Sequence, residues 1–266
     1  MLSEHRTEFT KQAIDNYLRE VAKAYRKQIG KKMPAEMVLV GGASVLVNYG
    51  FREMTTDIDA LIHAASCMKD AINEVGDRFS LPNGWLNADF KNTDSYTPKL
   101  IEFSRYYKTY ANVLTIRTIS AEYLIAMKLR SGRRYKNDLS DILGILAAHK
   151  KGNEPIAMAQ IQKAVSDLYG DWSAVPPASQ KFIRDVMDGE RYETLYEEIQ
   201  HQELEAKDFL LQLEESGLDA PTASNVDAIV DSMQRQDTDS LLELLRKRQE
   251  QQNTAQKGER KKGQER

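Results

Sequence analysis

Two aspartates, Asp57 and Asp59, are the side chains in this sequence that are best suited to chemistry. They lie in a segment, residues 56–62, whose alternating pattern predicts a β-strand. Side chains two residues apart in a strand project from the same face, so the two carboxylates should project together. Neighbouring carboxylates repel each other and need a cation between them, and hard oxygen ligands suit Mg²⁺. The pair therefore predicts a magnesium site.

A pair of glycines, Gly41 and Gly42, precedes the aspartates and suggests a phosphate-binding turn. The pair follows an apolar run, residues 37–40, that predicts a buried strand, and it precedes a segment, residues 43–49, that suits a short helix. Glycines before a helix let backbone N–H groups approach a phosphate, and the helix N-terminus favours its negative charge. Alone, Gly-Gly is usually a tight turn and Asp-x-Asp a solvated surface. In strand–turn–helix–strand order, the two features favour metal-assisted transfer onto or from a nucleotide.

This segment resembles the nucleotidyltransferase superfamily, specifically the AbiEii-like and DUF6036-like bacterial proteins. Their signature is Gly-Gly, a short helix, and Arg-x-Thr-x-Asp-x-Asp. The residues on or near this signature are Gly41, Gly42, Ser44, Arg52, Thr55, Asp57 and Asp59. Thr55 keeps its register with the aspartates, whereas Arg52 lies one residue earlier than the signature expects. A second resemblance covers EYLIAMKLRSGR (residues 122–133) and KNDLSDI (residues 136–142), which are similar to two helices of the same proteins.

The resemblance covers residues 35–148 and implies a fold, an activity and partners. The implied fold is mixed α+β, a small mixed sheet with flanking helices that is followed by a helical C-terminal region. The aspartate pair would bind Mg²⁺ and a nucleoside triphosphate (NTP), and a nucleotidyl group would pass to an acceptor such as tRNA, another RNA or a protein. The branch also implies the toxin component of a bacterial toxin–antitoxin or phage-defence module, with a cognate antitoxin as partner.

A third carboxylate normally joins the pair from a neighbouring strand in such proteins. The corresponding segment here, Trp85-Leu86-Asn87-Ala88-Asp89, carries its acid one residue out of place. Asp89 is the first candidate for the third carboxylate, and Glu102 is the competitor.

Basic residues of the second motif suggest contacts with phosphate. Lys128 is expected to contact the triphosphate as a catalytic residue, and Arg133 is expected to bind the nucleotide or the acceptor backbone, since Arg grips phosphate through two N–H groups. Cations at the end of a helix also satisfy its last carbonyl groups, which is the structural alternative. Asp138 and Asp141 are expected to hold Lys128 or Arg134 in place.

A second function class stays open beside the enzyme. The chain would then be a catalytically inactive nucleotidyltransferase fold that serves as a nucleotide- or protein-binding module. Two features favour it, namely the displaced third carboxylate and an acidic block, residues 185–215, that would suit a partner interface as well as a solvated surface.

Composition places the chain among globular proteins. Its 266 residues are 41% hydrophobic and 29% charged, with a net charge of −3. No apolar run approaches the about 18–20 residues that a membrane span needs. The single cysteine, Cys67, excludes an internal disulfide, and a cytoplasmic location is expected.

The elements expected to position the site follow from hydrophobic periodicity. A long helix should occupy the first thirty residues and end at Gly30. Further strands are expected at residues 85–90, 100–103 and 113–119, and further helices at residues 67–79, from 120, at 137–148 and beyond Pro155. The expected domains are an N-terminal helix (1–34) packing on the core, a nucleotidyltransferase-like domain (35–150), a helical region (151–247) and a disordered basic tail (248–266).

Overall fold

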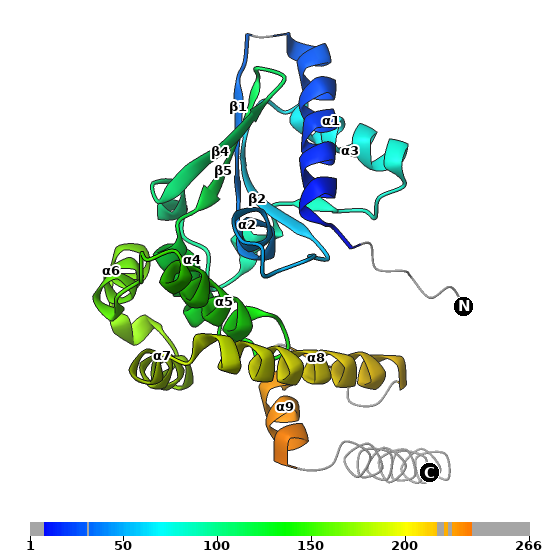
Figure 1. Cartoon of the computed structure of the whole chain (residues 1–266). Helices are drawn as coiled ribbons and strands as arrows, with labels where there is room; N and C mark the ends of the chain where they lie inside the picture. The colour runs from blue at the N-terminus through cyan, green and yellow to red at the C-terminus, as the bar shows by residue number, and fades with distance from the viewer. Residues whose placement is uncertain (1–7, 31, 217–220, 223–224, 236–266) are drawn as a thin grey trace, which may run out of the picture. The chain divides into compact units, whose positions relative to one another are not determined.

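The computed structural model describes residues 8–30, 32–216, 221–222 and 225–235 (Figure 1). The chain divides into two compact units. The first comprises Met1–Gly132 and Asp138–Tyr196, and the second comprises Arg133–Asn137 and Glu197–Arg266. The expected tail, residues 248–266, lies outside the described residues.

The first unit is built on a five-stranded mixed sheet, which confirms the mixed α+β fold class. The strands are β1 (Ala35–Leu39), β2 (Ile58–His63), β3 (Leu86–Asn87), β4 (Ser104–Tyr110) and β5 (Leu114–Ile119). Their order is β3-β2-β1-β5-β4. β1 is antiparallel to β2 and parallel to β5, β3 is parallel to β2, and β4 is antiparallel to β5. Strands were expected near β1, β2 and β5, and these three are confirmed.

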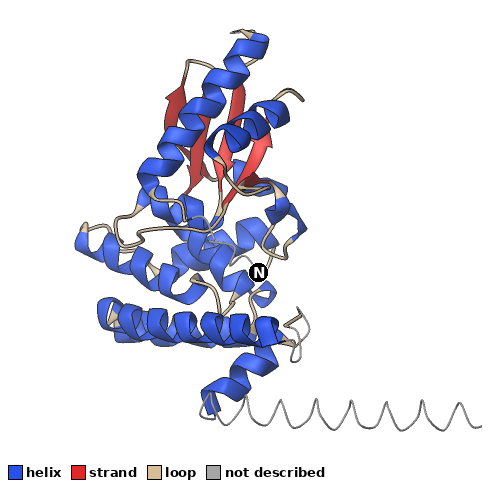
Figure 2. Cartoon of the chain, turned by 90° about the vertical axis from the view of Figure 1, so that its right-hand side faces the viewer, coloured by secondary structure: helices blue, strands red, loops and turns tan. Residues whose placement is uncertain are grey.

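One face of the sheet is covered by α1 (Lys11–Ile29) and α3 (Met68–Phe79), which pack against each other (Figures 1 and 2). Alternate residues of β1 and β2 enter the core beneath these helices, as period-two alternation in a strand requires. Thr10 caps the start of α1 by accepting a hydrogen bond from the Ala13 N–H, and Gly30 ends the helix with a φ of 67°. The predicted stop at Gly30 is confirmed.

Two strand predictions on the way from β3 to β4 need correction. The segment 100–103 is no strand, because Thr97 caps a 3₁₀ helix, η2 (Pro98–Ile101), by accepting from the Lys99 N–H, and the fixed φ of Pro98 suits the first turn of a helix. The apolar Leu100 is buried from this helix instead. The segment 85–90 supplies only the two residues of β3 before a second 3₁₀ helix, η1 (Asp89–Asn92), begins.

Helices dominate the rest of the described chain. They are α2 (Gly41–Asn48), α4 (Ala121–Ser131), α5 (Asp138–Lys151), α6 (Met158–Tyr169), η3 (Trp172–Ala174), α7 (Pro177–Gly189), α8 (Tyr192–Ser216) and α9 (Val226–Arg235). α4 packs against α5, α6 and α7 within the first unit. α8 begins in the first unit and continues into the second, whose small core includes Ala206 and Val230. None of the helices in the described residues is long and apolar enough to cross a membrane.

Candidate functional site

The turn between β1 and α2 faces the carboxylate of Asp59. Gly41 has a φ of +54°, in the left-handed region that favours glycine, and a Cβ atom built on it would lie 3.8 Å from Asp59 Oδ2. The Val40 N–H donates to the Asp59 carbonyl at 3.0 Å, because β1 and β2 are neighbouring antiparallel strands. The structure thus brings the predicted glycine turn and the second predicted aspartate together.

The side chains of Thr55 and Arg52, which fall on or near the family signature, lie against Gly42. A Cβ atom on Gly42 would lie 2.8 Å from Thr55 Oγ1 and 2.9 Å from Arg52 Nη2. Glycine is therefore required here by a close approach rather than by its backbone angles. Arg52 reaches the turn although it lies one residue earlier than the family signature expects.

The two aspartates lie at the start of β2 and differ in exposure. Asp59 is half-buried within the strand, and Asp57 is exposed immediately before it. In the described part of the chain, no three His, Cys, Asp or Glu side chains form a group that could hold a metal ion. Mg²⁺ is commonly held by one or two carboxylates together with waters and substrate phosphates, so a pair of aspartates beside the predicted phosphate-binding turn is a donor set that fits it. Metal binding by Asp57 and Asp59 remains a prediction.

Ser44, another residue of the predicted nucleotide site, ties α2 to the sheet. Its side chain is fully buried, and its Oγ accepts a hydrogen bond from the Ile119 N–H at 3.0 Å. This contact holds the short helix against the end of β5. A nucleotide contact by Ser44 remains a prediction.

A buried cluster of charged side chains joins the two sequence motifs. Lys128 of α4 is 7% exposed, and its Nζ lies 2.9 Å from Asp138 Oδ1 and 2.7 Å from Asp141 Oδ2, both on α5. This confirms that the two aspartates hold Lys128. The same Asp141 Oδ2 lies 2.5 Å from Arg52 Nη1. The cluster therefore connects α4 and α5 to the residue beside Gly42.

The charge state of Lys128 follows from its partners. Burial alone would lower the pKa of Lys128, and the nearby Arg52 also lowers it. The charges of Asp138 and Asp141 outweigh both effects, so the pKa of Lys128 is raised above its ordinary value. Lys128 is thus protonated at neutral pH.

The Arg52–Asp141 ion pair is the contact that sequence reasoning missed. The spacing of the second motif shows that Asp138 and Asp141, three residues apart, share one helix face, but it does not indicate which cations they contact. Arg134, the other expected partner of these aspartates, pairs with Asp231 at 2.7 Å within the second unit.

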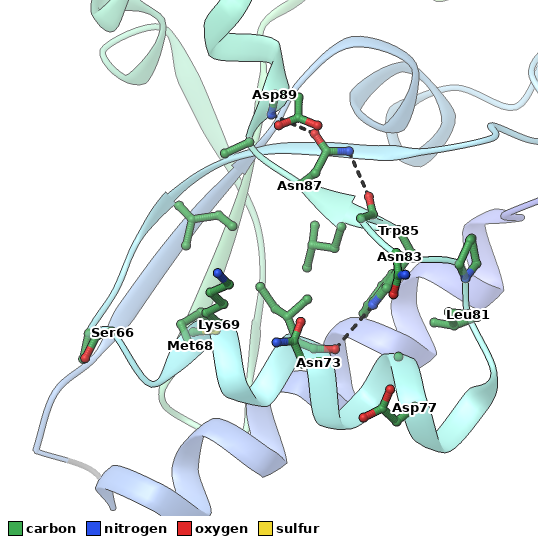
Figure 3. Close-up of a pocket in the computed structure, with 18 residues that line it drawn as sticks. Ser66, Met68, Lys69, Asn73, Asp77, Leu81, Asn83, Trp85, Asn87 and Asp89 are labelled. Atoms are coloured by element: carbon green, nitrogen blue, oxygen red, sulfur yellow. Dashed lines mark hydrogen bonds between the residues drawn. The ribbon is translucent and has the colours of Figure 1, made fainter.

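The two candidates for a third carboxylate lie at different edges of the sheet. Asn87 of β3 pairs with Asp59 of β2, and the Asp89 N–H donates to Asn87 Oδ1 at 2.8 Å (Figure 3). Glu102 lies directly before β4, and two strands, β1 and β5, separate β4 from β2. The strand order therefore favours Asp89 as a neighbour of Asp59.

Asp89 also lines a groove of about 820 Å³ beside α3 and β3, together with Lys69, Asn73 and Asn87 (Figure 3).

Of the remaining predicted residues, Arg133 belongs to the second unit. The structure groups Gly41, Gly42, Arg52, Thr55 and Asp59, and it links Lys128 to them through Asp141.

A mixed sheet whose first strand delivers a glycine turn against an aspartate of the next strand defines a nucleotidyltransferase-like protein. The chain belongs to the family described as nucleotidyltransferase of unknown function (DUF6036), whose model matches residues 16–148. The match includes both sequence motifs and α5 as far as residue 148, the part of the helix where Asp138 and Asp141 lie. No curated protein and no solved structure shows a significant match to the chain.

Proposed function

We propose that this protein is a Mg²⁺-dependent nucleotidyltransferase that transfers a nucleotidyl group from an NTP to an acceptor. The observation that carries the proposal is the approach of Asp59 Oδ2 to Gly41, at the N-terminus of α2. A phosphate at this turn would meet backbone N–H groups and the positive end of the helix, with a carboxylate of the predicted metal site alongside.

Each residue of the site has a distinct task in this proposal. The Gly41-Gly42 turn and the start of α2 bind the phosphate chain, and the Arg52 guanidinium beside Gly42 neutralises part of its charge. Asp57 and Asp59 would hold Mg²⁺, which supplies positive charge at the reacting phosphate when it is bound. The oxygen of the acceptor hydroxyl forms a bond to the α-phosphorus while its proton passes to water. The bond from the α-phosphorus to the oxygen that bridges to the β-phosphate breaks, and pyrophosphate leaves.

The acceptor and the biological setting are proposed on the resemblance to AbiEii-like proteins. That resemblance supports tRNA, another RNA or a protein as acceptor, and the toxin role in a toxin–antitoxin or phage-defence module, with a cognate antitoxin. We expect the protein to act in the cytoplasm, where its single cysteine stays reduced.

A catalytically inactive nucleotide- or protein-binding module is the second candidate function. One observation favours it, namely that the described residues contain no three-carboxylate group of the kind that binds two metal ions. Such a module would still bind an NTP at the glycine turn, but it would transfer nothing.

Incubation of the protein with each labelled NTP, Mg²⁺ and total tRNA tests the proposal. We expect label in the tRNA or the protein with at least one NTP, and its loss on addition of a chelator or in Asp57→Asn and Asp59→Asn. Asp185→Asn is the matched control, because Asp185 is an exposed residue of α7 whose carboxylate pairs with Lys181 of the same helix. NTP binding without any transfer would favour the inactive module, and the absence of both would contradict the two functions.

A further inference from the structure

We propose that Asp141 is a positioning residue that holds the Arg52 guanidinium against Gly42, where Arg52 contacts the phosphate chain of the NTP, and that Lys128 balances the charge of this arrangement. The inference rests on the proposed function, which it deepens. It gives Arg52 the direct phosphate contact and gives Lys128 an indirect role.

The guanidinium of Arg52 is fixed by two of its nitrogen atoms. Nη1 lies 2.5 Å from Asp141 Oδ2, and Nε donates to the Met54 carbonyl at 3.0 Å. The third nitrogen, Nη2, points to the glycine turn, where it lies 2.9 Å from the Cβ position of Gly42. A planar guanidinium that is fixed on two sides presents its remaining N–H groups in one direction. The remaining N–H groups of Arg52, on Nη2, therefore point toward the predicted phosphate site at Gly42.

Burial makes the Asp141 contact strong and directional. The side chain of Asp141 is 3% exposed and that of Arg52 is 14% exposed, so water screens their attraction little. α5 carries Asp141 and is packed against α4, so the carboxylate sits on a rigid element rather than on a loop. Arg52, in contrast, lies in the irregular segment between α2 and β2 and depends on a partner for its orientation.

Lys128 completes the charge balance of the cluster. Lys128 pairs with both Asp138 and Asp141, and Arg52 pairs with Asp141, so loss of any one of these charges changes the net charge of the cluster. Without Lys128 the cluster would lose one positive charge beside the turn, which would make the turn less favourable for a triphosphate. Removing the charges of Lys128 and Asp138 together leaves the net charge unchanged and should therefore preserve phosphate binding. If Lys128 instead contacted the triphosphate directly, the same double substitution would weaken binding.

Calorimetric titration with inorganic tripolyphosphate in the presence of Mg²⁺ tests the inference without any transfer reaction. We expect Arg52→Gln and Asp141→Asn each to weaken binding about tenfold, since a charge-assisted contact is lost in both. The double variant should bind as weakly as Arg52→Gln alone, because Asp141 acts through Arg52. Lys128→Met combined with Asp138→Asn should bind nearly as well as the unaltered protein.

Asp15→Asn is the matched control. Asp15 is a half-buried carboxylate of α1 that also holds a cation, since its Oδ2 lies 3.1 Å from Lys108 Nζ, and its removal should leave tripolyphosphate binding unchanged. Thermal unfolding of every variant establishes that it is folded. If Asp141→Asn does not fold, Asp141→Glu replaces it, because the longer side chain keeps the charge and shifts the carboxylate.

Two results would overturn the inference while leaving the proposed function intact. One is an additional loss of affinity when the Asp141 substitution is made in Arg52→Gln, and the other is a tenfold loss in the Lys128→Met and Asp138→Asn double variant. If the unaltered protein binds neither tripolyphosphate nor any NTP, the proposed function fails together with the inference.

Discussion

Arg52 and Asp141 are 89 residues apart in the sequence, yet Arg52 Nη1 lies 2.5 Å from Asp141 Oδ2. The neighbouring residue Phe51 also packs on α5, where a Cβ atom on Gly144 would lie 2.5 Å from the Phe51 ring. The segment between α2 and β2 thus contacts α5 in two ways. Arg52 pairs with Asp141, and the Phe51 ring packs where Gly144 has no side chain. The two motifs that appear separately in the sequence are therefore in direct contact in the folded protein.

Lys128→Ala should strongly destabilise the protein. The substitution leaves the carboxylates of Asp138 and Asp141 buried at 1% and 2% exposure without their shared cation. Removal of one partner from a buried ion pair costs about 3–5 kcal/mol of the free energy of unfolding. Urea unfolding measures this loss. Lys150→Ala is the control, because its pair with Glu190 is exposed, and it should show no measurable change. Equal stability of the two variants would contradict the prediction.

Gly42→Ala should impair ligand binding more than stability. The new Cβ would lie 2.9 Å from Arg52 Nη2 and 2.8 Å from Thr55 Oγ1, so the guanidinium must move away from the turn. We expect tripolyphosphate to bind about tenfold more weakly, as for loss of the Arg52 contact. The free energy of unfolding should change by less than about 1 kcal/mol. Displacing the neighbouring side chains lowers it, but alanine has a higher helix propensity than glycine, by about 1 kcal/mol, which offsets this loss. Gly50→Ala, with no atom within 4 Å of its Cβ, should change neither property.

The sequence was sufficient to predict the parts of this site that depend on local pattern. The apolar run before Gly41-Gly42 and the alternation around Asp59 predicted β1, α2 and β2, and the family signature predicted their grouping. The ion pair between Arg52 and Asp141 could not be predicted, because it depends on how α5 packs under a distant loop. The strand prediction for residues 100–103 was wrong for a related reason. A short apolar run such as that around Leu100 can be buried from either a strand or a 3₁₀ helix, and periodicity does not distinguish the two.

Asp57→Asn and Asp59→Asn should remove the response of the protein to metal without lowering its stability. Loss of one of two neighbouring carboxylates relieves repulsion in the metal-free protein, so the melting temperature in the presence of a chelator should stay equal or rise. Mg²⁺ added with an NTP should raise the melting temperature of the unaltered protein, since it binds only the folded state. That increase should disappear in both variants. Undiminished metal binding by the double variant would show that these aspartates are not the ligands.

Asp89→Asn should slow nucleotidyl transfer, whereas Glu102→Gln should not. Asp89 follows Asn87, which pairs with Asp59 across β2 and β3, and Glu102 precedes β4 at the opposite edge of the sheet. A third carboxylate must come from a position beside the first two, so only Asp89 meets this requirement. Both residues are exposed, and neither variant should lower the melting temperature appreciably. Steady-state kinetics with the preferred NTP distinguishes them, and a lower kcat in Glu102→Gln alone would reverse the assignment.

Asp15 should make the stability of the protein sensitive to acid. Burial alone would raise the pKa of Asp15, but hydrogen bonds from Tyr110, Lys108 and Tyr107 outweigh it and lower the pKa below its ordinary value of 3.8. Burial raises the pKa of Tyr107 to about 12, and its hydrogen bond to the charged Asp15 contributes to the rise. The Tyr107 hydroxyl therefore keeps its proton and stays a donor at neutral pH. A carboxyl group whose pKa is lower in the folded state stabilises that state fully above its unfolded pKa, and the contribution is lost as the pH falls through the folded pKa.

Asp15→Asn tests this dependence, because it removes the charge and keeps the shape of the side chain. The difference in unfolding free energy between the unaltered protein and Asp15→Asn should be constant above about pH 5 and should shrink as the pH falls below 3.8. Urea unfolding at a series of pH values measures it. Tyr110→Phe removes the hydroxyl group that donates to Asp15 Oδ1 at 2.6 Å, so it should make the pH dependence shallower. A difference that stays constant down to the acid limit of the folded state would mean that Asp15 titrates alike in the folded and unfolded chains.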